Sequence, residues 1–314
     1  KLYFLVSNAA LLLIRLLESR NLIKSYCKTK HYIAKQPLQK VFGVKYFRFL
    51  RIMFRRYLHH AYIIYYNRAK FMEGEVNLTG WDFSALTNSG RMKETPLPWD
   101  YAEIIKLRLP GVKRMLDMGT GGGEFLKTLA PLPAETYATE GYAPNVGIAE
   151  ANLNPLGVKV VSGYSDDSLP FESAYFDLII NRHEYYDPQE VHRILKPGGH
   201  FITQQVAGNC DASLLAALGR SVPEETKGWC LASAEKDVEA AGFKILQQSE
   251  APGYTIFTDS GAVISYLKII NWLIDDFTVE KYSAELKQIA EEISTSGSFS
   301  STLDRFLLVS WKLT

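Results

Sequence analysis

From residue 73 onward, short apolar runs alternate with stretches of helical periodicity. The apolar runs predict strands at 114–118, 136–140, 158–162, 176–181 and 201–206. Helical patterns fill some of the intervals, at 124–130, 145–153 and 187–195. Strands and helices that alternate at this spacing form βαβ units, and strands that are apolar on both faces need helices on both sides of the sheet. The pattern therefore predicts an α/β fold built on a parallel sheet.

The chain after residue 230 adds a second group of predicted elements. A helix is expected at 232–241, followed by a strand at 243–248, and a closing strand at 303–313. Between these strands, two further helices are expected at 261–274 and 279–293. The polar run 294–301 predicts a flexible loop.

Charge divides the chain into two parts. Fifteen of the 35 Lys and Arg side chains, but only Glu18 of the 34 acids, lie in residues 1–72. This segment therefore carries a net charge of +14, and residues 73–314 carry −13. Within it, Lys45, Arg48, Arg51 and Arg55 recur at helical spacing. The asymmetry predicts a basic, aromatic-rich extension at 1–72 and a separate domain at 73–314.

Three interpretations of the extension stay open. Basic and aromatic side chains together suit RNA. Alternatively, the segment lies on an anionic membrane, with residues 2–17 as an anchor. The third interpretation, which we favour, is that residues 1–72 do not belong to the natural protein and that translation starts between Met72 and Leu78.

Composition excludes several classes of protein. With 47% hydrophobic and 22% charged residues, the chain can bury a core and is not disordered throughout. Three cysteines (Cys27, Cys210 and Cys230) match neither a disulfide framework nor a zinc pattern, which favours a reducing compartment and a cytoplasmic location. No stretch reaches the ~18 uninterrupted apolar residues of a membrane span, so stable membrane insertion is not expected.

The strongest motif is a glycine loop between a strand and a helix. Asp117 precedes glycines at alternate positions 119, 121 and 123 in the pattern D-x-G-x-G-x-G. An ordinary strand-to-helix turn needs fewer glycines, so the loop indicates close approach of a ligand to the backbone. The dinucleotide pattern G-x-G-x-x-G would place glycine at 124, where Glu124 stands and would repel a pyrophosphate. A nicotinamide-dependent oxidoreductase is therefore a disfavoured alternative.

This loop resembles motif I of the class I S-adenosylmethionine-dependent methyltransferases. Glu140 ends the next predicted strand, where the family places an acid that binds both ribose hydroxyls. Residues 163–171 resemble the family's loop beside the adenine ring, with Asp166 or Asp167 as the residue that reaches the amine. The segments 175–184 and 195–199 also match, so the resemblance covers about residues 99–206 and is nearest to an uncharacterised bacterial branch.

The resemblance implies a fold, a cofactor and a set of donor-binding residues. The fold is a Rossmann-like, doubly wound, seven-stranded mixed sheet with helices on both faces and an antiparallel last strand. The cofactor is S-adenosylmethionine. The implied donor-binding residues lie at the loop and at the strand ends: Asp117, Gly119, Thr120, Gly121, Gly123, Glu140, Gly141, Asp166, Asp167 and Asn181. Because the helices after residue 257 exceed the family's usual connection, residues 257–300 are predicted to form a helical lid.

Candidate acceptor residues follow the fourth predicted strand. His183 is a candidate general base, since an ordinary histidine titrates near pH ~6.5, although it could instead simply hydrogen-bond the loop. Arg182 and Glu184 could bind a polar acceptor, and Trp99 and Tyr185 could stack on a planar one. His183 and His192 do not share a helical face, so no metal site is expected.

Together these features predict transfer of a methyl group from S-adenosylmethionine to an O, N or C atom. A small molecule is the expected acceptor, because the negative charge of 73–314 disfavours unaided nucleic-acid binding. An RNA or protein acceptor stays open, as does a non-catalytic protein that binds S-adenosylmethionine or tethers RNA. The sequence does not indicate an oligomeric state.

Overall fold

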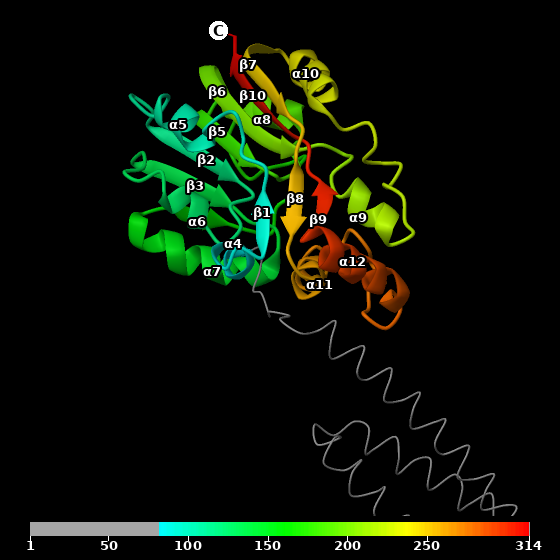
Figure 1. The fold of residues 1–314 in the computed structure, drawn as a ribbon. Helices are drawn as coiled ribbons and strands as arrows, with labels where there is room; N and C mark the ends of the chain where they lie inside the picture. Colours follow the sequence, from blue (N-terminus) through cyan, green and yellow to red (C-terminus); the bar gives the residue numbers. More distant parts are fainter. Residues whose placement is uncertain (1–81, 314) are drawn as a thin grey trace, which may run out of the picture. The chain divides into compact units, whose positions relative to one another are not determined.

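The structure is a computed structural model that describes residues 82–313 (Figure 1). The predicted extension at 1–72 lies outside the described residues. Seven strands form one sheet in the order β4-β3-β2-β5-β6-β10-β7. Their bounds are β2 (Arg114–Met118), β3 (Glu135–Thr139), β4 (Lys159–Val161), β5 (Phe176–Arg182), β6 (Leu195–Val206), β7 (Phe243–Ala251) and β10 (Arg305–Lys312).

The sheet is mixed, as the resemblance implied. The pairs formed among β2, β3, β4, β5 and β6 are parallel. Strand β10 is antiparallel to both β6 and β7. The predicted strand 114–118 coincides with β2, whereas the strand predicted at 201–206 begins earlier, at Leu195. The seven-stranded mixed sheet is confirmed.

Helices cover both faces of this sheet, which confirms the doubly wound arrangement. On one face, α8 (Pro188–Ile194) and α10 (Leu231–Ala240) bury Val191 and Val238 against Phe201 and Phe306. The other face carries α5 (Tyr101–Lys106), α6 (Glu124–Lys127) and α7 (Ala143–Leu153). The local sequence fixes the start of α8, because the Asp187 side chain accepts a hydrogen bond from Gln189 N at 2.8 Å and proline occupies the first turn.

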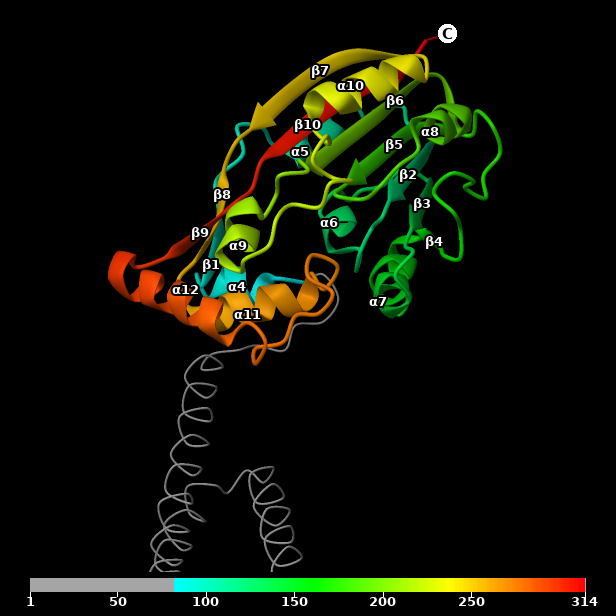
Figure 2. The ribbon, with the colours of Figure 1, turned by 90° about the vertical axis from the view of Figure 1, so that its right-hand side faces the viewer.

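A second, smaller sheet adjoins the first. After Ala251 the β7 strand breaks at Pro252 and Gly253 and resumes as β8 (Tyr254–Phe257), while β9 (Phe299–Thr302) leads into β10 in the same way. The two breaks are tied together, since Leu303 N donates to Gly253 O at 2.8 Å. Strand β1 (Met92–Glu94) joins β8 and completes the order β1-β8-β9. One antiparallel ribbon thus passes from the large sheet into the small one (Figure 2).

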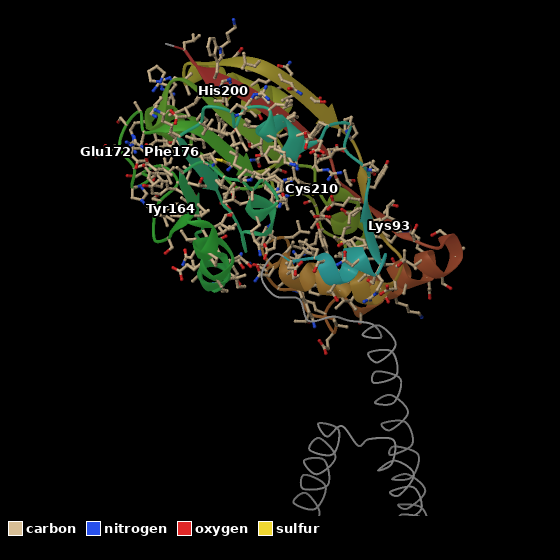
Figure 3. All side chains as sticks on the ribbon, turned by 90° about the vertical axis from the view of Figure 1, so that its left-hand side faces the viewer. Lys93, Tyr164, Glu172, Phe176, His200 and Cys210 are labelled. Carbon is tan, nitrogen blue, oxygen red and sulfur yellow. The ribbon has the colours of Figure 1, made fainter. Side chains whose placement is uncertain are left out.

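The small sheet has its own hydrophobic core. Around it pack α4 (Ser84–Asn88), α9 (Ala212–Ala217), α11 (Ser260–Ile269) and α12 (Ser283–Ser296), with Leu86, Leu214, Phe257, Val263 and Leu286 among the buried residues. Figure 3 shows Cys210 between Lys93, on the small sheet, and His200, on the large one.

The structure contradicts one prediction for the C-terminal region and agrees with another. The predicted loop 294–301 is wrong, because α12 continues to Ser296 and β9 begins at Phe299. The helices predicted at 261–274 and 279–293 exist as α11 and α12, with shifted ends. Residues Gly261 to Leu267 of α11 are all buried, so this helix forms a packed wall. Closure of 257–300 as a lid stays a prediction.

Candidate active site

A cavity of about 2020 Å³ opens where the carboxyl ends of the parallel strands face the small sheet. Open α/β sheets bind ligands at this edge. One end of the cavity is lined by the glycine loop after β2 and by Glu140 and Gly141 after β3. The wall continues from Arg182, at the end of β5, to Tyr186, and reaches Tyr266 of α11 and Ile270 and Trp272 just after this helix. A single cavity therefore connects the predicted donor residues with the second core.

The glycine loop has the backbone that its sequence requires. Gly119, Gly121 and Gly123 have φ values of 66°, 62° and 83°, which disfavour any residue with a side chain. The loop is anchored on β3, because Thr120 N donates to Thr139 O at 2.9 Å. Gly123 does not line the cavity; a Cβ there would lie 2.6 Å from Leu153 of α7. Gly119, Thr120 and Gly121 do line it.

Two buried acids face the cavity beside this loop. Asp117 and Glu140 are each 4% exposed, and Glu140 Oε1 accepts a hydrogen bond from Tyr142 N at 2.6 Å. Burial raises the pKa of Asp117 to about 6, and the negative charge of Glu140 acts in the same direction. Burial also raises the pKa of Glu140. A cation beside such a buried carboxylate stabilises its charged form, so this end of the cavity favours a cationic ligand.

The predicted adenine loop lies at the edge of this region. Asp166 is half-buried and Asp167 is exposed, and neither lines the cavity. Asp167 accepts a hydrogen bond from Ser165 Oγ, which keeps it within its own turn. Tyr164 comes closer to the donor residues, since a Cβ built on Gly141 would lie 3.6 Å from its hydroxyl oxygen. The adenine contact of Asp166 or Asp167 stays a prediction.

The segment after β5 is held by residues of two other elements. Asn181 is fully buried, and its Oδ1 accepts from Thr203 Oγ1 at 2.9 Å. Its carbonyl accepts from the Tyr101 hydroxyl at 2.8 Å. Gln205 Nε2 donates to Glu184 O at 3.0 Å. In this structure Asn181 supports the loop and does not line the cavity, so its predicted donor contact remains untested.

His183 lies in the cavity wall with an unusual backbone. Its φ is 62°, a left-handed value that is uncommon outside glycine. Its Nε2 lies 3.2 Å from Gln204 Nε2, and Gln204 Oε1 accepts from Trp99 Nε1 at 2.9 Å. Desolvation by the surrounding protein, together with the charges of Arg182 and Arg305, lowers the pKa of His183 to about 3. Such a group is mostly neutral near pH 7 and is a weak base, so the geometry favours another role.

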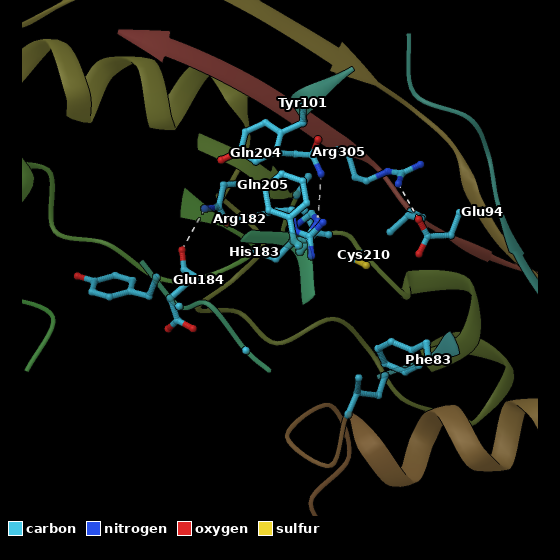
Figure 4. Close-up of a pocket in the computed structure, with 18 of the residues that line it drawn as sticks. Phe83, Glu94, Tyr101, Arg182, His183, Glu184, Gln204, Gln205, Cys210 and Arg305 are labelled. Carbon is cyan, nitrogen blue, oxygen red and sulfur yellow. Dashed lines mark hydrogen bonds and ion pairs between the residues drawn. The ribbon is translucent and has the colours of Figure 1, made fainter. Parts of the chain in front are cut away.

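The other predicted acceptor residues surround His183. Glu184 lies against Gly119, and burial, with repulsion from Asp166 and Glu140, raises the pKa of Glu184 to about 7. The Arg182 guanidinium lies 4.3 Å from the centre of the Phe125 ring. Tyr185 is 68% exposed and lines the cavity. The structure therefore brings Trp99, Arg182, His183, Glu184 and Tyr185 to the lining of one cavity. Figure 4 shows Arg182, His183 and Glu184 close to one another there.

Comparisons with known proteins agree with this geometry. A family model described as a methyltransferase domain matches residues 116–203. The ubiquinone biosynthesis O-methyltransferase of Ruegeria pomeroyi is 27% identical over 129 residues, which cover 37% of this chain and 52% of that protein. The chain thus spans about half the length of this curated relative. The solved structure of protein BH2331 from Bacillus halodurans has a TM-score of 0.50 at 19% identity, covering 68% of this chain and 99% of that chain.

The chain contains a class I S-adenosylmethionine-dependent methyltransferase domain. The donor end of the methyltransferase domain fits this cofactor, which has a sulfonium and an ammonium group but no phosphate. Within residues 82–313, neither Asp117 nor Glu140 forms an ion pair with a basic side chain, so Asp117 can face these cations and Glu140 can accept from the ribose hydroxyls. A Cβ at Gly119 would occupy space beside the loop, only 2.4 Å from Glu184.

The methyltransferase domain also has cavity residues that the sequence did not single out. Gln204, Cys210, Asp211, Tyr266 and Arg305 line the side away from the glycine loop. Arg305 is 8% exposed and donates to Glu94 Oε2 at 2.7 Å, and Asp211 accepts from the Tyr266 hydroxyl at 2.9 Å. The available signal was polarity, because Gln204 follows the apolar pair Phe201 and Ile202 in β6 and Arg305 precedes the apolar run 306–309 in β10.

Within residues 82–313, no helix is both long and apolar enough to cross a lipid bilayer.

Proposed function

We propose that this chain transfers a methyl group from S-adenosylmethionine to an oxygen atom of a small molecule held in the same cavity. The observation that carries the proposal is the continuity of this cavity. It begins at the glycine loop and Glu140, passes Glu184, and ends at side chains of the second core. Donor and acceptor can therefore meet in one cavity.

The size and charge of the site favour a small acceptor. A volume of about 2020 Å³ exceeds the ~300–1,000 Å³ of an ordinary ligand pocket and leaves room for two molecules. The far end is lined by Phe83, Trp99, Tyr266 and Leu273, which suit an apolar or planar body. The 33 acids and 20 basic residues from position 73 onward disfavour an RNA acceptor.

The curated relative supports oxygen as the atom to test first, because it is named as an O-methyltransferase. S-adenosylmethionine supplies an activated methyl group when bound, so the protein mainly has to align the acceptor, which can contribute ~7–11 kcal/mol. Asp117 and Glu140 would hold the cationic donor, and Trp99 and His183 would orient the acceptor. The carboxylate of Glu184, with its pKa of about 7, suits removal of a hydroxyl proton.

We also propose that the segment 257–300 shapes the acceptor end, since Ile270, Trp272 and Leu273 line the cavity. Its closure over bound acceptor would exclude water. A cytoplasmic location, expected from the cysteine content, is part of the same proposal.

Calorimetric titration of the full chain with S-adenosylmethionine tests the donor site. We expect binding that weakens at least tenfold in Glu140→Ala and stays within twofold in Glu150→Ala, a control on the exposed face of α7. Release of S-adenosylhomocysteine in the presence of a panel of phenols and aliphatic alcohols then tests transfer. Absence of donor binding would overturn the proposal, and binding of NADH in its place would favour the oxidoreductase alternative. Donor binding with no transfer to any acceptor class would favour a non-catalytic protein.

A further inference from the structure

Three side chains from separate parts of the chain form a hydrogen-bonded chain on the cavity wall. Figure 4 labels two of them, Gln204 and His183. Trp99 precedes α5, Gln204 lies near the end of β6, and His183 follows β5. The Trp99 Nε1 to Gln204 Oε1 distance is 2.9 Å, and the Gln204 Nε2 to His183 Nε2 distance is 3.2 Å. The chemistry of each group decides which atom donates the hydrogen bond and which accepts it.

The indole N–H of Trp99 can only donate a hydrogen bond. The amide of Gln204 must therefore turn its oxygen toward Trp99, which leaves its NH2 group toward His183. An amide NH2 is also only a donor, so His183 Nε2 has to accept with its lone pair. A neutral imidazole that accepts at Nε2 carries its proton on Nδ1. The network thus assigns the Nδ1–H tautomer to His183.

The backbone reinforces this arrangement. His183 has a φ of 62°, and its N–H donates to Gln204 O at 2.9 Å. Residues in this left-handed region persist only where their surroundings hold them, and they gather at functional sites. Both the main chain and the side chain of Gln204 therefore fix the position of His183.

The Nδ1 atom of His183 is available for a hydrogen bond to a ligand. The His183 side chain lines the cavity, and within the described residues Nδ1 has no hydrogen-bond partner. The charged groups around it are Arg182 and Glu184 on its own segment and Arg305 on β10, which is paired with Glu94. The two guanidinium groups oppose protonation of the ring, in agreement with the low pKa of His183.

We propose that Gln204 is a positioning residue that holds His183 as a hydrogen-bond donor to an oxygen atom of the acceptor molecule, with Trp99 fixing the orientation of Gln204. The inference rests on the proposed methyl transfer. It assigns to the acceptor a hydroxyl, carbonyl or phenolate oxygen at this point. An ammonium group there would meet a donor and be rejected, because two donors cannot pair.

The tautomer can be measured without any turnover. The full chain, labelled with 15N-histidine, is examined by long-range 15N–1H NMR between pH 5.5 and 8.5, with His183→Asn to assign the signal. We expect a protonated Nδ1, an unprotonated Nε2 and no titration in this range. A protonated Nε2 in the neutral ring would overturn the proposal whether or not the protein methylates anything.

Variants separate positioning from a merely structural role. In Gln204→Glu the new carboxylate accepts from both neighbours, so we expect a proton on His183 Nε2 and a rise of the His183 pKa by at least one unit. Trp99→Phe frees the amide to turn, and we expect a mixture of tautomers. Gln189→Met, on the exposed side of α8, is the control and should leave the spectrum unchanged. An unchanged His183 signal in Gln204→Glu and Trp99→Phe would also overturn the proposal.

Steady-state kinetics then test whether the His183 tautomer affects binding of the acceptor. We expect Gln204→Met to raise KM for an oxygen acceptor at least tenfold while the Kd for S-adenosylmethionine stays within twofold. Loss of donor binding to the same extent as acceptor binding would show a general structural role and contradict the proposal. If no acceptor is turned over, the proposed function fails while the NMR result still decides the assignment of His183.

Discussion

Glu184 lies directly against Gly119. A Cβ built on this glycine would lie 2.4 Å from both Cβ and Cγ of Glu184 and 2.7 Å from its Oε2. The first glycine of the loop after β2 therefore does two things. It adopts a φ of 66°, and it leaves room for a carboxylate from the segment after β5. This contact joins the donor loop to the acceptor wall.

Replacement of Gly119 by alanine should disturb both sides of this contact. The left-handed φ costs about 1–3 kcal/mol for a residue with a Cβ, and the stem of Glu184 has to move as well. We expect a lower free energy of unfolding in urea and a loss of donor affinity of at least tenfold. Gly147→Ala is the matched control, because nothing lies within 4 Å of a Cβ built in α7. That variant should be neutral or more stable by about 0.5–1 kcal/mol. Equal donor affinity in the two variants would contradict the argument.

Donor affinity should depend on pH through the acids of the site. In the free protein, the pKa of Asp117 is about 6 and that of Glu184 about 7, both raised chiefly by desolvation. A bound cation stabilises the carboxylate form, so binding releases protons where these groups are still protonated. Affinity should be greatest above pH 7 and fall as the pH drops through 7 and then 6. Calorimetry from pH 5.5 to 8.5 should show a loss of about tenfold or more. Affinity that rises on acidification would contradict this assignment.

The Glu184→Gln variant tests the raised pKa of Glu184 through its effect on the stability of the fold. The folded pKa of about 7 lies above the ordinary value of 4.5, so the folded state binds the extra proton between these values. The free energy of unfolding contributed by this group is highest below pH 4.5 and is lost as the pH rises through 7. The variant should therefore melt above the parent protein at pH 8 and close to it at pH 5. A destabilised variant at pH 8 would show that ionised Glu184 is instead stabilised by its surroundings.

Trp272 allows the acceptor wall to be tested without damage to the second core. Complete removal of 261–293 would expose Leu86 and Phe257, which α11 and α12 cover. Trp272 is 62% exposed and lines the cavity. Trp272→Ala should change the free energy of unfolding by less than about 0.5 kcal/mol. It should raise acceptor KM at least fivefold and leave donor Kd unchanged. Leu246→Ala, on exposed β7 outside the cavity lining, is the control for lost apolar surface.

The sequence predicted the large sheet because its signals are local. Strand β2 and the glycines after it follow one another directly, so the sequence alone predicted a glycine loop at the carboxyl end of this strand, where the structure has it. The small sheet has no such local signal. Its strands have three or four residues, and Met92 pairs with Phe257 far along the chain. The contact between His183 and Gln204 was hidden for the same reason, since it depends on the parallel pairing of β5 with β6, which places Gln204 opposite Arg182.

Arg305 tests whether the two sheets act as one stable unit. It begins β10, is 8% exposed, and donates to Glu94 Oε2 at 2.7 Å and to Thr95 O, both on the segment that contains or follows β1. Arg305→Leu removes these bonds and leaves the Thr95 carbonyl without this donor, which costs about 1–3 kcal/mol. Lys106→Ala, which removes an exposed pair with Glu103, should cost less than about 0.5 kcal/mol. Urea unfolding followed by tryptophan fluorescence measures both. If Arg305→Leu is no more destabilising than Lys106→Ala, the buried guanidinium does not hold β1 to the large sheet, and the acceptor wall must be positioned by its hydrophobic core alone.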